Sequence, residues 1–139
     1  MIRRLGRGHT TTTQLNRVGK QLFRDAWAGA HAVDVKPKLP STATKYMILN
    51  LDRTGKPGSH WVAVIIKGAT AYIFDSFARS SNKLIPTWLR NTRHRYKHID
   101  AQHDKRTNQA KQSDICGQLS LAWMLYARAR GISSAMKDI

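Results

Sequence analysis

The sequence predicts one α+β domain in which a central, mainly antiparallel sheet is flanked by helices. Three observations lead to this fold class. The chain has 139 residues, which suits a single domain (1–139) with one modest core. An amphipathic helical pattern near the start is followed by three short apolar runs with strand character, and the most apolar helical pattern comes near the end. Elements in this order are typical of an α+β domain with a buried helix against its sheet.

The first helix is predicted to begin beside Thr11. Residues 1–10 are basic, contain glycine and show no periodicity, so we expect them to form a flexible basic arm. Thr11 and Gln14 match the capping-box pattern, in which a hydroxyl and an amide satisfy free N–H groups at a helix start. The apolar residues that follow on one helical face are Leu15, Val18, Leu22 and Ala26, widened by Phe23 and Trp27. We expect the helix to stop near Gly29, before an irregular segment over 33–44 that contains two prolines.

Three short strands are expected next, over 46–50, 61–66 and 71–74. The second run is apolar almost throughout, which predicts a strand that is buried on both faces. A turn rich in glycine and proline separates the first two runs, and a tight connection joins the last two, so the last two should form a hairpin. Trp61 and Phe74, in this hairpin, are expected to be core residues.

The second half of the chain is expected to hold two more helices and a short strand. A helix over 80–90 contains Pro86, so it should begin late or be kinked. Residues 94–99 are expected to form a short edge strand, and the polar residues 101–115 a loop. The helix over 117–130 is the most apolar segment with a helical pattern, and we expect it to be buried.

The charge of the chain is strongly positive and predicts a polyanionic partner. There are 24 lysines and arginines against eight acids, all of them aspartate, giving a formal net charge of +16. An excess of this size favours binding to nucleic acid, which we expect to be non-specific and weakened by salt. No apolar run is long enough for a membrane-spanning helix, and no apolar segment follows the basic N-terminus as in a secretory signal, so no membrane partner is expected.

Cys116 is the only cysteine, so no disulfide can form within the chain, and a reducing compartment is expected. One thiol also excludes a zinc site built from several cysteines. His94 and His98 are spaced for one helical face, with His103 nearby, but this segment is rich in arginine and lysine. A solvated basic surface is therefore the preferred interpretation, and no metal or other cofactor is expected to be required.

Three residues with suitable chemistry stand at the ends of predicted elements. His60 precedes the second strand and Asp75 follows the third, so a hairpin would make them neighbours, with the carboxylate able to orient the imidazole. Cys116 begins the buried helix, where the helix N-terminus and a nearby imidazolium would lower the pKa of its thiol. Gly117 would allow close approach of substrate or sheet. Each residue alone has a simpler structural explanation, and it is their combination that indicates nucleophilic catalysis.

An oxyanion formed at such a site would need hydrogen-bond donors. The backbone N–H of Cys116 is one, and a side-chain amide from the preceding loop is a second. Gln109 and Gln112 are both available for this role.

Four stretches together resemble the adenovirus-type cysteine proteases (adenain-like) and, more distantly, the SUMO- and ubiquitin-like-protein proteases of the same fold. The stretch Gly58-Ser59-His60-Trp61-Val62-Ala63 is similar to the histidine motif of the family. Tyr72-Ile73-Phe74-Asp75-Ser76-Phe77 is similar to its acid motif, and Gln109 to Gly117 to its oxyanion and nucleophile motif. Residues 46–52 resemble the strand before the histidine. The resemblance spans about residues 12–128.

This resemblance implies His60 as base, Asp75 as orienting acid, Cys116 as nucleophile and Gln109 as oxyanion donor. Gln109 lies seven positions before Cys116, as in the adenoviral members, while Gln112 remains an alternative. Trp61 and Gly117 would line the substrate side of the site. The implied fold places the nucleophile at the start of a buried helix.

The viral members of the family cut virion precursor proteins, typically at small or glycine-containing sites, and adenoviral members are stimulated by DNA. The resemblance therefore implies a maturation endopeptidase of a double-stranded DNA virus or virus-like element, found in the virion and the infected host cell, with viral precursor polypeptides as substrates. We expect the chain to be a monomer. Double-stranded DNA would be a non-specific partner and a possible activator. The candidate DNA contacts are Arg3, Arg4, Arg90, Arg93, Arg95, Lys97, Lys105 and Arg106.

Two alternatives stay open from the sequence. The same chemistry could serve an isopeptidase that removes ubiquitin or SUMO-like modifiers, although the glutamine spacing argues mildly against it. The chain could also be a catalytically inactive, DNA-binding virion protein on the same scaffold, which the charge alone would support.

Overall fold

The structure is a computed structural model of the chain, and it describes residues 11–32, 44–50, 61–68, 70–75, 97–100 and 116–138. The helices in this part are α2 (Thr12–Phe23), α5 (Cys116–Arg130) and α6 (Ile132–Asp138), with a short 3₁₀ turn, η1 (Arg24–Ala26). The strands are β1 (Trp27–Ala32), β2 (Lys45–Asn50), β3 (Trp61–Lys67), β4 (Thr70–Phe74) and β5 (Lys97–Asp100). The predicted arm, residues 33–43 of the predicted irregular segment, the 80–90 helix and the 101–115 loop lie outside the described residues.

The strands form one mixed sheet in the order β1-β2-β3-β4-β5. β3 pairs antiparallel with both β2 and β4, as predicted for the centre of the sheet. β1 is parallel to β2, and β5 is parallel to β4. The α+β class is therefore confirmed, while the expectation of a mainly antiparallel sheet is wrong for its two outer strands.

The start of α2 agrees with the capping-box prediction. The Thr11 hydroxyl accepts a hydrogen bond from the Gln14 backbone N–H at 3.2 Å, and the Gln14 side chain accepts one from the Thr11 N–H at 2.8 Å. The end of the helix does not agree, because α2 stops at Phe23 rather than near Gly29. Arg24 has a φ of +50°, a left-handed conformation that interrupts the helical path.

The strand β1 was not predicted, because its first residue continues the apolar spacing of the helix before it. Trp27 turns back onto α2 from the strand: its indole N–H donates to the Asn16 side chain at 3.0 Å, and its ring stacks on Phe23 with centroids 5.9 Å apart. The same Asn16 oxygen accepts the Ala30 backbone N–H at 2.9 Å, which fixes β1 against the helix. The Trp27 ring therefore packs on the side of α2 that the sequence pattern predicts, but Trp27 belongs to β1 and not to the helix.

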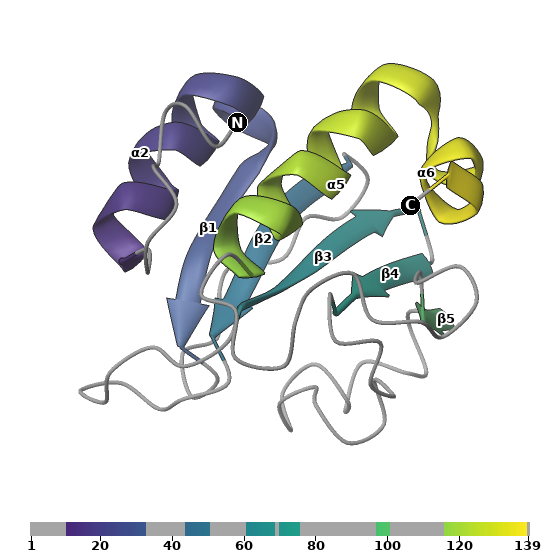
Figure 1. Ribbon diagram of the computed structural model, residues 1–139, viewed down its shortest axis with the longest axis horizontal. Helices are drawn as coiled ribbons and strands as arrows, with labels where there is room; N and C mark the ends of the chain where they lie inside the picture. Colours follow the sequence, from purple (N-terminus) through teal and green to yellow (C-terminus); the bar gives the residue numbers. More distant parts are fainter. Residues whose placement is uncertain are drawn as a thin grey trace.

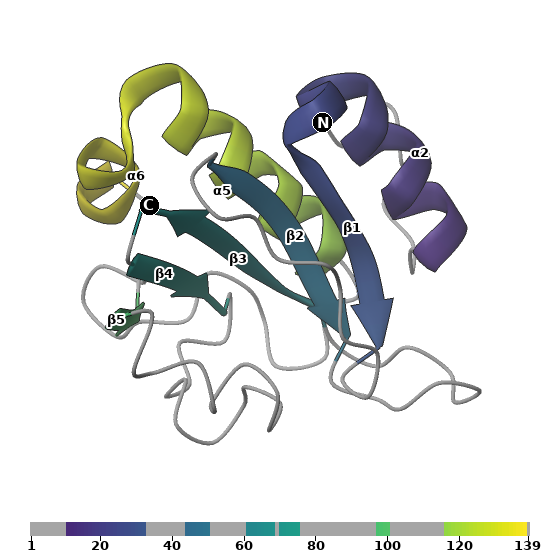
Figure 2. The same cartoon turned by 180° about the vertical axis from the view of Figure 1, so that it is seen from behind.

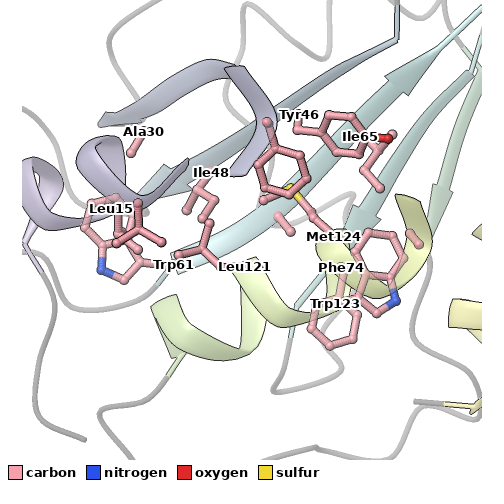
Figure 3. Close-up of a cluster of buried hydrophobic side chains, with 14 of the residues drawn as sticks. Leu15, Ala30, Tyr46, Ile48, Trp61, Ile65, Phe74, Leu121, Trp123 and Met124 are labelled. Atoms are coloured by element: carbon pink, nitrogen blue, oxygen red, sulfur yellow. The ribbon is translucent and has the colours of Figure 1, made fainter. Parts of the chain in front are cut away.

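Helices cover one face of the sheet. Figures 1 and 2, which view the molecule from opposite sides, show α2 and α5 on the same side of the strands. The core on this face joins α2, α5 and α6 to alternate residues of the strands (Figure 3). Its largest fully buried members are Leu15, Ile48, Trp61, Ile65, Phe74, Leu121 and Trp123.

The other face of the sheet is also buried, although none of the described helices lies on it. Its members are Met47, Leu49, Val62, Val64, Ile66, Ala71 and Ile73, each at most 1% exposed. Because β3 contributes to both faces, the prediction of a strand buried on both sides is confirmed.

The helix α5 also agrees with its prediction, beginning one residue earlier than expected. Its apolar residues are spread around its circumference, which suits a helix packed into a core. The final helix, α6, was not predicted; it adds the buried Ala135 to the core on the helical face. None of the helices in the described ranges combines the length and apolar character needed to cross a membrane.

Candidate active site

The predicted catalytic residues are described to different degrees. Asp75 is described fully, and Cys116 is placed as the first residue of α5. His60 and both glutamine candidates, Gln109 and Gln112, lie outside the described residues. Of the predicted DNA contacts, Lys97 is the first residue of β5. The others also lie outside the described residues: Arg3, Arg4, Arg90, Arg93, Arg95, Lys105 and Arg106.

The hairpin of β3 and β4 brings the start of one strand beside the end of the other. Ala63 pairs with Phe74 in the antiparallel register. Asp75 follows Phe74 directly, so continuing this register sets Asp75 beside Val62, two residues after His60 in the sequence. Asp75 is only 1% exposed. Charged side chains are seldom buried to this extent without a partner, so its position at a strand end is consistent with a functional carboxylate.

The first turns of α5 contact the start of β3. The Ser120 hydroxyl donates a hydrogen bond to the backbone carbonyl of Trp61 at 3.4 Å, and both groups are buried. Ser120 lies one helical turn after Cys116, on the same side of the helix. Trp61 is the residue that directly follows His60. This hydrogen bond therefore joins a residue near the predicted nucleophile to the immediate neighbour of the predicted base.

A second contact joins α5 to the end of β4. The rings of Phe74 and Trp123 are stacked, with centroids 5.0 Å apart and planes at 4°, and Figure 3 shows the two side by side. Both side chains are at most 1% exposed. Phe74 is the residue directly before Asp75. The helix α5 thus packs against the immediate neighbours of both the predicted base and the predicted acid.

Two residues predicted to border the substrate are buried. Trp61 is 2% exposed and belongs to the core beneath α5, as its prediction as a core residue requires. Gly117 is buried in the first turn of α5. Their proposed contribution to substrate binding stays a prediction.

Sequence reasoning did not single out three polar residues that are buried at this end of the sheet. Asn50 is 4% exposed and pairs with Trp61 across β2 and β3, and Gln118 and Ser120 are 1% and 0% exposed in the first turns of α5. A usable signal existed, because each is a polar residue within or at the end of an apolar run. Buried polar side chains of this kind nearly always have hydrogen-bond partners, so they restrict how the surrounding elements can pack.

A histidine other than the predicted base lies at the same end of the sheet. His31 of β1 pairs with Leu49 of β2, and its Nε2 atom is 2.7 Å from the Ala28 carbonyl oxygen. His31 lies on β1, which is separated from β3 by β2. Its ring contacts the Ala28 carbonyl oxygen of the same strand. His31 is therefore a suitable comparison residue for tests of His60.

In the described ranges, no group of three or more histidine, cysteine or aspartate side chains is placed to share an ion. The histidines that the sequence spacing marked for this role, His94, His98 and His103, lie outside these ranges, apart from the strand position of His98 in β5.

Comparison with known proteins adds no family assignment: no protein-family model and no curated protein matches this sequence.

Proposed function

We propose that this chain is a cysteine endopeptidase in which Cys116 is the nucleophile, His60 its base, Asp75 the residue that orients the histidine, and Gln109 a donor to the oxyanion. The observation that supports it best is the double contact of α5 with the residues next to His60 and Asp75. Adjacent Cα atoms are about 3.8 Å apart, which keeps His60 close to Trp61. Four helical residues rise by about 6 Å, which keeps Cys116 close to Ser120. Asp75 directly follows Phe74 in the same way. These short separations would allow the side chains of Cys116, His60 and Asp75 to meet at one end of the sheet.

Thiol activation in this arrangement follows from two nearby positive influences. The N-terminus of α5 carries partial positive charge, and an imidazolium at position 60 would add a full charge, so both favour the thiolate. The carboxylate of Asp75 would hold the histidine in the required tautomer and stabilise its protonated form. Because Asp75 is buried, it is shielded from the solvent screening that weakens exposed charge pairs.

The reaction would proceed by acyl transfer. His60 takes the thiol proton, and the sulfur of Cys116 bonds to the carbonyl carbon of the peptide, whose oxygen becomes an oxyanion held by the Cys116 N–H and Gln109. The carbon–nitrogen bond then breaks as His60 returns the proton to the leaving amine. Water, deprotonated by His60, attacks the thioester, and the new carboxylic acid and the free thiol are released.

The biological role that we propose is maturation of viral precursor polypeptides, cut at small or glycine-containing sites by a monomeric enzyme in the virion and the infected cell. Non-specific binding to double-stranded DNA would concentrate the enzyme near such substrates. The net charge of +16 supports this partner.

The decisive experiment is proteolysis of a peptide library by the purified chain and its variants. We expect Cys116→Ala and His60→Ala to abolish cleavage, and Asp75→Asn to lower kcat on the order of 100-fold or more, because the histidine loses its orienting charge. His31→Ala serves as the matched histidine control and should cleave like the wild type. Cleavage that survives Cys116→Ala in a folded protein would end the proposal, and activity restricted to ubiquitin or SUMO-like conjugates would assign the isopeptidase function instead.

A further inference from the structure

The exposed side of α2 and the residue that follows the helix carry three positive charges that the predicted site does not use. Arg17, Lys20 and Arg24 are spaced three and four residues apart, and all three are exposed. The opposite side of the helix is buried through Leu15, Val18, Gly19 and Phe23. Arg17 and Lys20 are three residues apart and share the solvent side of α2, and Arg24 is exposed directly after the last residue of the helix.

Two further cations from other elements meet the end of α2. The guanidinium of Arg128, from α5, donates to the Leu22 carbonyl and lies 4.8 Å from the centroid of the Phe23 ring. The ammonium of Lys45, from β2, donates to the Asp25 carbonyl. Five cations from four elements therefore gather along and at the end of α2, and we call Arg17, Lys20, Arg24, Lys45 and Arg128 the basic ridge.

The charges of the ridge are poorly neutralised. Asp25 is the only carboxylate within α2 and η1. Among the described residues, Arg17, Lys20 and Arg24 have no ion-pair partner. Arg128 and Lys45 have a structural explanation, since cations near the end of a helix stabilise its free carbonyls. The exposed cations Arg17, Lys20 and Arg24 have no such contact to explain them, apart from the favourable position of Lys20 in the last turn of α2.

We propose that the basic ridge is the surface that binds the phosphate backbone of double-stranded nucleic acid. Arginine and lysine side chains along one helix can contact successive phosphates without reading bases. A membrane surface is a poorer fit, because the apolar side of α2 is packed in the core and cannot insert into lipid. The inference rests on the DNA-binding part of the proposed function and is independent of the cysteine chemistry.

The part of the ridge at the end of α2, formed by Arg24, Lys45 and Arg128, lies away from the predicted catalytic end of the molecule. Cys116 begins α5, and Arg128 lies twelve residues later, near its other end, which corresponds to about 18 Å along the helix. Figure 1 shows α2 and α5 both ending toward the top of the view, on the side opposite to the start of α5. Nucleic acid on the ridge would therefore leave the catalytic end free to meet a substrate.

The test compares two triple variants that remove equal charge. Arg17→Gln, Lys20→Gln and Arg24→Gln together remove three ridge cations, while Lys67→Gln, Arg130→Gln and Lys137→Gln remove three exposed cations from other positions. Binding to a fluorescent duplex of about 20 base pairs is followed by anisotropy between about 0.05 and 0.2 M salt, where each phosphate contact contributes about 0.9 to the logarithmic salt slope. Circular dichroism and urea unfolding check that each variant is folded.

We expect the ridge variant to lower the magnitude of the salt slope by about 2.7 and the control variant to leave it unchanged. Equal losses in both variants would show that only net charge matters and would overturn the inference. The inference would also be overturned if the ridge variant bound the duplex normally but lost binding to poly-aspartate, because the partner would then be an acidic protein. If the triple variant does not fold, Lys20→Gln against Lys137→Gln should still differ in slope by about 0.9. Because anisotropy reads binding alone, the result is unaffected by whether the chain cleaves peptides.

Discussion

Replacing Gly19 by alanine is expected to destabilise this protein, although alanine is normally the better helix residue. Gly19 lies within α2, where glycine costs about 1 kcal/mol relative to alanine. A Cβ atom at this position would stand 2.3 Å from Cε2 and 2.4 Å from Cζ2 of the Trp27 indole ring. These separations are far below the roughly 3.5 Å of a normal carbon–carbon contact, so the ring or the helix must move.

The indole ring cannot move without further loss, because it donates to Asn16 and stacks on Phe23. Overpacking of this kind costs about 1–3 kcal/mol, and a contact of three ring atoms supports the upper value. Set against the gain of about 1 kcal/mol in helix propensity, the net loss for Gly19→Ala is about 2 kcal/mol. With a denaturant slope of about 2 kcal/mol per molar urea, the unfolding midpoint should fall by about 1 M.

A double-mutant cycle tests the cause of this loss. In a Trp27→Ala background the ring is absent, so Gly19→Ala should stabilise the protein by about 1 kcal/mol, which gives a coupling energy of about 3 kcal/mol between the two positions. Urea unfolding of the four proteins measures this coupling. If Gly19→Ala raises the urea unfolding midpoint in the wild-type background, the close packing of Trp27 on α2 is refuted.

Three further predictions concern stability measured by urea unfolding. Ser120→Ala should cost about 1 kcal/mol, because the Trp61 carbonyl loses its buried donor; an unchanged midpoint would mean that this bond contributes nothing. Asn16→Ala should cost about 2 kcal/mol, since two N–H groups lose their acceptor, whereas Asn16→Asp should cost less; equal losses would contradict the acceptor role. Burial raises the pKa of the Tyr46 phenol, partly opposed by Arg128, so its contribution to stability should be complete below about pH 10 and be lost as the pH rises through the raised pKa. The stability difference between wild type and Tyr46→Phe should therefore shrink above about pH 10, and a constant difference would contradict it.

Local patterns were enough to predict much of this fold. The capping box at Thr11, the strands β2 to β4 and the buried helix α5 each follow from residue type and spacing within one segment. The burial of β3 on both faces follows from its unbroken apolar run. These features depend on neighbours in the sequence, which is why they can be found without a structure.

Features that depend on distant contacts could not be found in this way. The end of α2 is set by the positive φ of Arg24, a conformation that its residue type does not signal, and by Trp27 packing back onto Gly19. The parallel pairing of β1 with β2 depends on how the chain crosses between them, which residue patterns do not encode. At the candidate site, the sequence indicated that strand and helix ends would meet. It did not indicate that Ser120 contacts Trp61 or that Trp123 stacks on Phe74.

The central claim is that the thiol of Cys116 is activated by His60, and the pH dependence of its alkylation tests this most directly. The rate of reaction with iodoacetamide reports the thiolate, and Cys116 is the only thiol in the chain. We predict that the wild type and His31→Ala react with a midpoint well below the value of about 8.5 for a free cysteine, and that His60→Ala moves the midpoint up toward it. A common midpoint near 8.5 in all three folded proteins would contradict the proposed catalytic pair.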